Sequence, residues 1–545
     1  MASSATARLR GASLLVSLQL ASRLIAFLVN QLLLIRRLSA PQLGLAAKLD
    51  ASAQTVLFLA RDGLRVAVPR LRDPSPQAVV NLGYLATFFG ALALIVVVVF
   101  VDLGGASLPV YVVAALLELL AEPAFLLIQA KLRFGTRALA ESVAGLVRCL
   151  VVSVVVGSSS FIDDADVMPF ALGQLAYALA LLFVYNMAVY RLASALGFSL
   201  LPRPMSGTAF FVGGYLHRPA VRFAASVSAQ GLVKHLLTQG DTLLVTVLAS
   251  THVQGVYALA NNYGGLLARL LFQPVEESCR GYFSLLLSPE HEKQTNTDSS
   301  DDDAARRAVK QTDPDTTSPK QQPTADSPLV EARHSLATLA RLYLILSSVV
   351  VALGPVAAPP LLALVAGPRW SAAGAGSVLA IYSLYVPFLA LNGLAEAFVA
   401  SVADEPQLHR QSLFMAVFSL VFAVAAFVLM RVLGFGAHGL VVANMINLLC
   451  RICWCAVFIK AYFRRHRLTF SLTALFPRYT LGAALAVGAA LARMRVLDRA
   501  ESEPVLTLAK VAAWAIPLLA IIIFFERSLL LHCFHTVRGQ EAVKR

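Results

Sequence analysis

Two glutamates, Glu118 and Glu122, are spaced so that their carboxylates lie on one face of a helix. Carboxylates this close repel each other when both are ionised, so we expect one of them to be protonated or salt-bridged. A proton-coupled exporter could use this arrangement. The alternative is that both glutamates are structural partners of arginines. Pro123, the next residue, is expected to kink the helix here.

Cationic side chains also occur within or at the ends of apolar segments. A charge at the middle of a membrane costs roughly 2.5–3.5 kcal/mol on insertion scales, so such a side chain is expected to face a cavity or a partner. Snorkelling to the membrane surface, or a structural ion pair, is the alternative. The cations concerned are Arg23, Arg61, Arg65, Arg148, Lys234, Arg269 and Arg451.

Amides and further acids form a third set. Glu276 follows Arg269 by two helical turns, so both are expected on one face, where they could form a polar gate or a helix-end network. Buried amides usually bond across helices, which is packing rather than function. The candidates for a polar cavity or gate are Glu118, Glu122, Asn261, Asn262, Gln273, Glu276, Glu277, Asn392, Glu396 and Asn444.

The composition indicates the environment in which these side chains must act. Of the 545 residues, 58% are hydrophobic and 14% are charged, whereas soluble proteins carry about 25% charged residues. The mean hydropathy of +0.71 also argues against a soluble enzyme. The net charge of +14 would suggest a nucleic-acid partner in a soluble protein, but in a membrane protein it marks cytoplasmic loops. No nucleic-acid partner is predicted.

A membrane-spanning helix needs about 20 apolar residues, and the chain offers fourteen such segments. The break formed by Gly354, Pro355, Pro359 and Pro360 leaves no room for two crossings, so 331–366 is predicted to be one long or kinked span. The predicted spans are 11–35, 42–66, 79–101, 107–130, 138–158, 168–190, 228–250, 253–287, 331–366, 376–400, 411–432, 436–461, 472–492 and 504–525.

The charges of the short loops predict the orientation of the chain. With the N-terminus in the cytoplasm, the basic loops at 70–72, 131–137, 203–222 and 464–467 share its side. Acidic loops at Asp102 and 163–166 fall on the other side. Arg36 and Arg37, after the first span, are the exception. An even number of helices places both termini in the cytosol.

Two segments interrupt the apolar pattern. A basic connector, 191–227, follows an N-terminal six-helix lobe, 1–190. An acidic insertion, 288–328, has too little apolar surface to fold and is predicted to be disordered. It interrupts a second six-helix lobe, 228–465, after which 466–545 supplies a C-terminal helix pair and a cytosolic tail.

Four stretches resemble a known family. They are VLFLARDGLR at 56–65, GVYALANNYGGLLARLLFQPVEESCRG at 255–281, YSLYVPFLALNGLAEAF at 382–398 and GLVVANMINLLCR at 439–451. Their sequence, order and spacing resemble the eukaryotic endoplasmic-reticulum oligosaccharide-lipid translocation family, within the multidrug and oligosaccharidyl-lipid exporter superfamily. The resemblance covers nearly the whole chain and is weakest in 191–227, in 288–328 and after about 465.

This resemblance implies a fold and a function. The implied fold is an all-α polytopic membrane protein with about fourteen spans, in which two six-helix lobes form a V and a helix pair is added. The implied substrate is Man5GlcNAc2 linked through a diphosphate to dolichol, which passes from the cytosolic to the lumenal leaflet for N-glycosylation. Arginine and lysine suit the diphosphate. The substrate-binding candidates are Arg23, Arg61, Arg65, Lys234, Arg269 and Arg451.

Two other functions remain as alternatives. A proton- or cation-coupled exporter of small molecules would use acids such as Glu118, Glu122 and Asp241 rather than arginines. A glycosyltransferase would need a folded loop around Asp164–Asp166 or Asp313–Asp315, and no loop is both long and apolar enough. Cys450, Cys453 and Cys455 lack histidine partners for a metal, and no nucleotide-binding glycine loop occurs. No enzyme, cofactor or metal is predicted.

Overall fold

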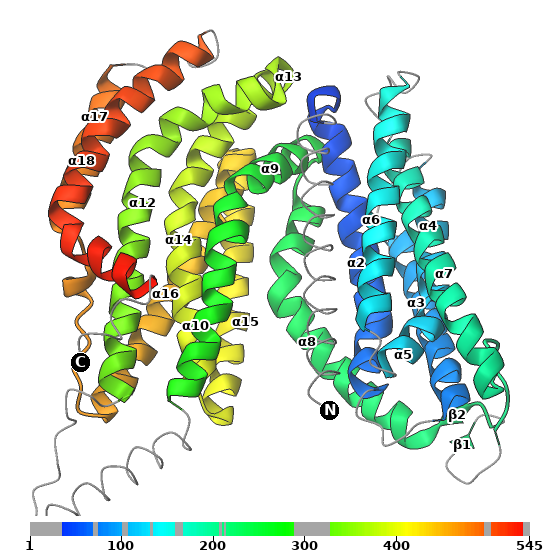
Figure 1. Ribbon diagram of the computed structural model, residues 1–545. Helices are drawn as coiled ribbons and strands as arrows, with labels where there is room; N and C mark the ends of the chain where they lie inside the picture. The colour runs from blue at the N-terminus through cyan, green and yellow to red at the C-terminus, as the bar shows by residue number, and fades with distance from the viewer. Residues whose placement is uncertain are drawn as a thin grey trace, which may run out of the picture. The chain divides into compact units, whose positions relative to one another are not determined.

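The computed structural model describes residues 35–68, 75–100, 107–130, 134–158, 167–205, 210–211, 214–287, 328–494 and 503–537. Within these ranges the chain is almost entirely helical (Figure 1). Ten of the helices are long and apolar enough to cross a membrane. The prediction of an all-α polytopic membrane protein is therefore confirmed, while the number of fourteen spans stays a prediction. The first predicted span and the insertion lie outside the described residues.

The chain divides into two compact units. The first contains the described residues up to Ala258 together with Val365–Ala373. Its elements are η2 (Ile35–Arg37), α2 (Ala40–Ala67), α3 (Pro76–Phe100), α4 (Leu108–Leu120), α5 (Glu122–Ala130), α6 (Phe134–Gly157), α7 (Met168–Leu196), β1 (Phe210–Phe211), β2 (Leu216–His217), α8 (Arg218–Leu248), the beginning of α9 (Thr251–Gly264), and α13 (Pro368–Ala372).

The second unit contains residues from Leu259 to Leu364 and from Gly374 onward. After the end of α9 come two segments of one predicted span, the π-helix η4 and then α10. The elements of this unit follow α9 in the chain. They are η4 (Ala268–Phe272), α10 (Gln273–Leu286), α12 (Pro328–Ala366), α14 (Ala375–Val402), α15 (Glu405–Phe427), η5 (Val428–Val432), α16 (Gly436–Arg465), η6 (Thr473–Leu475), α17 (Arg478–Arg493) and α18 (Pro504–Val537).

Every predicted span from 42 onward coincides with one helix or with consecutive helical segments. Residues 328–366 form the single helix α12, with Pro355, Pro359 and Pro360 inside it, as predicted. The predicted kink at Pro123 is a break at Ala121 between α4 and α5. At about 1.5 Å per residue, the 16 residues of α17 extend about 24 Å, which explains why it falls short of a full crossing.

The segment that joins α7 to α8 is shorter than the predicted connector 191–227. Helices α7 and α8 take up both ends of the predicted segment, and the described residues between the two helices are 197–205, 210–211 and 214–217. One face of α3 holds it. Asn81, which is buried, donates to the carbonyls of Arg203 (2.8 Å) and Tyr215 (2.9 Å). Gln77 bonds Leu201 one turn earlier, at 3.0 Å.

The exceptional arginines of the first loop bind backbone carbonyls. Arg37 donates through Nη1 to Val156 and Gly157, the last residues of α6, where carbonyls lack helical partners. Arg36 donates to Val365 at 2.9 Å. The indole of Trp370, 1% exposed, donates to Ile35 at 2.8 Å. These bonds give Arg36 and Arg37 structural roles in the first unit.

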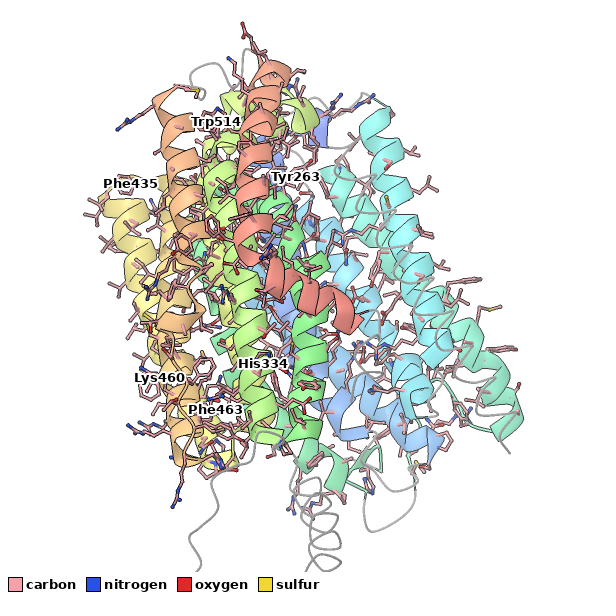
Figure 2. The ribbon with its side chains drawn as sticks, turned by 60° about the vertical axis from the view of Figure 1, so that its left-hand side comes forward. Tyr263, His334, Phe435, Lys460, Phe463 and Trp514 are labelled. Atoms are coloured by element: carbon pink, nitrogen blue, oxygen red, sulfur yellow. The ribbon has the colours of Figure 1, made fainter. Side chains whose placement is uncertain are left out.

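The C-terminal end of helix α16 is aromatic and basic. Figure 2 shows Phe435 beyond one end and Lys460 and Phe463 near the other. Phe463 stacks on Phe398 of α14 and on Phe470, with ring centroids 5.5 and 5.4 Å apart. Arg464 and Arg465 complete this end of the helix.

Candidate functional site

One face of α2 carries a series of ion pairs in the first unit. Asp50, Arg61 and Arg65 are separated by nearly whole helical turns, so they lie on the same side of the helix. Each bonds an oppositely charged group on another helix. Asp50 accepts from Arg148 of α6 at 2.8 Å, which joins α2 to α6.

Arg65 and Glu122 form the tightest of these pairs. The Nε and Nη2 of Arg65 donate to the two carboxylate oxygens of Glu122 at 2.6 and 2.7 Å, which is the two-point geometry favoured by guanidinium groups. The guanidinium lies 3.8 Å from the ring centroid of Phe125. Glu122 is 1% exposed. Arg65 is therefore held on two sides.

The guanidinium group of Arg61 makes fewer hydrogen bonds to its carboxylate partner than that of Arg65 does. Its Nη1 donates to Oε1 of Glu118 at 2.9 Å, and this is its one ion pair in the described part of the chain. The other oxygen of Glu118 accepts from Gln174 of α7 at 3.3 Å. Arg61 therefore retains guanidinium donors that Glu118 does not use.

These contacts bear on the two alternatives for the glutamate pair. Glu118 and Glu122 each face an arginine one helical turn apart on α2, as the alternative of structural ion pairs expects. Ionised carboxylates are compatible with this arrangement because each has its own cation.

A second group of polar side chains lies between α14 and α16. Glu396 approaches Arg451 to 3.7 Å, which is an ion pair but too long for a hydrogen bond. Three polar atoms here have no hydrogen-bond partner among the described residues: Oδ1 of Asn392, Oε1 of Glu396 and Nε of Arg451. Asn444, on the same face of α16 as Arg451, donates to Leu440 within its own helix. Unsatisfied buried atoms of this kind can serve a polar ligand.

Glu276 of α10 contacts the same region through Gly393 of α14. A Cβ atom at Gly393 would overlap the Glu276 carboxylate and would lie 2.7 Å from Oε2. The glycine therefore provides the space in which this carboxylate sits. Sequence inspection missed Gly393, although it stands beside Asn392 within one of the four family-like stretches.

A face of α10 next to Glu276 is polar and exposed. Gln273, Glu277 and Arg280 are all exposed and recur at helical spacing, whereas Cys279 and Phe283 are buried on the neighbouring face. In a segment predicted to cross a membrane, such side chains are expected to line a cavity rather than to meet lipid. Arg280 was not among the candidates, although its spacing from Gln273 and Glu277 could have indicated it.

The expected juxtaposition of Arg269 and Glu276 is not what the structure has. The π-helix η4 lies between them and changes the number of residues per turn, so their spacing no longer corresponds to two α-helical turns. Arg269 donates to the carbonyl of Asn262 instead. Asn261, which precedes Asn262 in α9, accepts a 2.7 Å hydrogen bond from Tyr382 of α14, so it makes a contact between helices.

Several candidates fall outside these two groups. Arg23 lies outside the described residues, and Lys234 belongs to α8 but its side chain is not described. Asp50 and Gln174 were not singled out from the sequence. In the described ranges no cluster of three or more histidine, cysteine or acidic side chains is placed to hold a metal ion.

Comparison with known proteins gives a consistent result. A family profile described as Rft protein (Rft-1) matches residues 7–536. A Yarrowia lipolytica protein named Man(5)GlcNAc(2)-PP-dolichol translocation protein RFT1 is 34% identical over 508 residues, covering 84% of this chain and 70% of that protein. The Saccharomyces cerevisiae protein of the same name is 30% identical and covers 83% of each chain.

Solved structures give the fold. The structure titled lipid II flippase MurJ, inward closed conformation, matches with a TM-score of 0.60 at 12% identity, covering 95% of this chain and 99% of that one. At this identity the match supports the polytopic helical fold alone. Family membership comes from the sequence comparisons, which extend over most of the described chain, and they show that this protein belongs to the Rft protein family.

Proposed function

We propose that this protein translocates Man5GlcNAc2-PP-dolichol from the cytosolic to the lumenal leaflet of the endoplasmic reticulum membrane, or is essential to that step. The observation that carries the proposal is the similarity, over most of both chains, to relatives named for this translocation. We further propose that the protein is not an enzyme, that both termini are cytosolic, and that lobes 1–190 and 228–465 are joined by 191–227.

The exposed face of α10 supports a polar path for the head group. The substrate joins a large polar glycan to an anionic diphosphate, and neither can cross hydrocarbon unaided. Gln273, Glu277 and Arg280 offer amide, carboxylate and guanidinium groups along one side of a helix. Such groups can exchange hydrogen bonds with sugar hydroxyls and phosphate oxygens.

Arg61 is our candidate for contact with the diphosphate in the first unit. It uses a single nitrogen to bind Glu118, whereas Arg65 uses two and also lies against Phe125. We therefore assign Arg65 to the structure of the unit and Arg61 to the substrate. The ion pairs of Glu118 and Glu122 also disfavour the proton-coupled exporter, which would need at least one of these acids to exchange protons freely.

The test of this assignment uses cells depleted of their endogenous family member. Wild-type protein is expected to clear accumulated Man5GlcNAc2-PP-dolichol and to restore N-glycosylation. Arg61→Gln should lower the clearance rate by roughly tenfold, the effect of about 1.4 kcal/mol. The double variant Arg61→Gln/Glu118→Gln should stay equally defective, because it lacks the cation although no unpaired charge remains.

Two outcomes would overturn parts of this proposal. Recovery of activity in the double variant would make Arg61 a structural partner of Glu118. Wild-type protein that reaches the endoplasmic reticulum but alters neither measurement would remove the translocation assignment. Arg137→Gln is the control, because Arg137 forms a partly exposed ion pair with Glu141 in the same unit.

A second prediction concerns the position of Glu276. Gly393→Ala is expected to reduce clearance as much as Glu276→Gln does, because the added methyl group displaces the carboxylate without removing its charge. Combining the two substitutions should cause no further loss. Gly281→Ala, in α10, is the control, because a Cβ there meets nothing within 4 Å. Independent, additive losses would show that the two residues act separately.

A further inference from the structure

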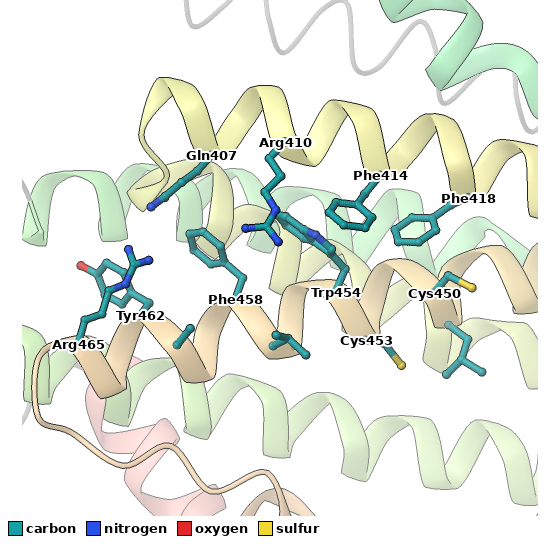
Figure 3. A pocket seen from close by; sticks show the side chains of 13 residues that line it. Gln407, Arg410, Phe414, Phe418, Cys450, Cys453, Trp454, Phe458, Tyr462 and Arg465 are labelled. Carbon is teal, nitrogen blue, oxygen red and sulfur yellow. The ribbon is translucent and has the colours of Figure 1, made fainter.

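A groove runs along the outer surface of the hairpin formed by α15 and α16. It encloses about 680 Å³, within the range of 300–1,000 Å³ typical of sites for small ligands. The residues that line it lie in 407–418 of α15 and 449–465 of α16 (Figure 3). It lies entirely in the second unit and shares no residue with the polar cluster around Glu396.

Aromatic side chains form a row along this groove. Figure 3 shows Phe418, Phe414, Trp454 and Phe458 following one another. Phe414 lies 6.1 Å from both Phe418 and Trp454, and Trp454 stacks on Phe458 at 5.7 Å, all measured between ring centroids. Such a row offers a rigid apolar track for one hydrocarbon chain.

One end of the row is cationic. Arg465 lies beyond Phe458, and Arg410 reaches the row from α15 on the other side of Phe458, where its guanidinium lies 5.7 Å from the Phe414 ring (Figure 3). Gln407 and Tyr462 add hydrogen-bonding groups at the same end (Figure 3). Among the described side chains that line the groove, none is acidic. The charge of this end therefore suits an anion.

The surroundings of the groove are apolar. Leu413, Leu420 and Val424 of α15 are exposed by 67%, 65% and 57%. An exposed face of this kind on a membrane-spanning helix is covered by lipid chains. An occupant of the groove is thus expected to be a lipid that keeps its chain in hydrocarbon and its head at the arginines.

We propose that this groove binds a polyprenyl diphosphate, with the prenyl chain along the aromatic row toward Phe418 and the diphosphate at the part of the groove that carries Arg410 and Arg465. A guanidinium group can bind phosphate oxygens at two points, and a single row of rings matches a single chain. A glycerophospholipid offers two chains, so it fits this arrangement less well. The inference rests on the proposed function, because it places a part of the proposed substrate on a surface separate from the polar face of α10.

The test is binding of geranylgeranyl diphosphate to the purified full-length protein, measured by native mass spectrometry. Arg410→Gln/Arg465→Gln should weaken binding by about tenfold or more. Arg464→Gln is the matched control, because Arg464 is exposed beside Arg465 but does not line the groove. Geranylgeraniol, which lacks phosphate, and phosphatidylglycerol should compete poorly.

Wild-type protein offers a second measurement that needs no variant. Cys453 is an exposed thiol that lines the groove, so geranylgeranyl diphosphate should slow its alkylation by a maleimide. Unchanged alkylation, unchanged binding in the double arginine variant, or equal competition by phosphatidylglycerol would each overturn the proposal. Binding is measured on purified protein, so failure of wild type in the cellular assay would reject the translocation role and leave this result standing.

Discussion

Replacement of Glu122 by leucine is expected to destabilise the protein by about 3–5 kcal/mol, because it leaves the charge of Arg65 unpaired in a buried site. Glu122 is 1% exposed and binds Arg65 through both carboxylate oxygens. The double variant Arg65→Leu/Glu122→Leu should lose much less, since no isolated charge remains. The measurement is the fraction of protein that stays monodisperse in detergent after heating.

The control for this prediction is Glu141→Ala. Glu141 forms a partly exposed pair with Arg137 one turn away on α6, and such pairs contribute about 0.3–0.5 kcal/mol. If Glu122→Leu loses no more stability than this control, the pair does not hold the unit together. A double variant as unstable as the single one would point to packing of the side chains rather than to charge.

Alanine at Gly255 is expected to disrupt the contact between α2 and α9. A Cβ at Gly255 would overlap the carbonyl oxygen of Ala40 and would lie 2.6 Å from its carbonyl carbon. A Cβ at Gly44 would in turn overlap the carbonyl oxygen of Thr251 and approach the Gly255 nitrogen to 2.8 Å. These atoms belong to the backbone, so the helices must separate.

The expected loss for Gly255→Ala is about 1–3 kcal/mol, as for other overpacked sites. Thermal unfolding in the same detergent measures it. Gly145→Ala on α6 is the control, because its Cβ meets nothing within 4 Å; alanine there should be neutral or stabilise by about 0.5–1 kcal/mol. Equal unfolding temperatures for Gly255→Ala and wild type would contradict the close crossing.

Composition and periodicity predict the helices well because membrane insertion imposes a length and a polarity on each span. Helix α12 illustrates this, since its three prolines suggested a break but its total length allowed one crossing. Within the membrane, neighbouring groups can satisfy the carbonyls that proline leaves free. The length of the apolar segment therefore predicts the single helix α12 better than the local helix propensity of its residues does.

The partners of the charged side chains could not be predicted in the same way. The sequence places Glu118 and Glu122 on one face, but nothing local pairs them with Arg61 and Arg65, which stand 57 residues earlier. Asp50 and Arg148 are 98 residues apart. Such pairs depend on the packing of α2 against its neighbours.

Two further features of the structure could not be predicted from the sequence, each for its own reason. The expected pairing of Arg269 with Glu276 assumed a continuous α-helix, and the π-helix η4 removes that regularity. The contacts that hold the connector could not be predicted locally, because its hydrogen bonds come from Gln77 and Asn81, more than a hundred residues earlier on α3. Amides on an apolar helix are the signal that could have revealed such a contact.

The contact of Trp370 with Ile35 sets an order of events during synthesis of the chain. The two residues are separated by 335 positions, yet both belong to the first unit. At about 5–20 residues per second, a ribosome needs on the order of 15–70 s to add the intervening residues. The first unit is therefore incomplete in the membrane during this time. The contact of Trp370 with Ile35 forms only after the segment Val365–Ala373 has been synthesised and inserted.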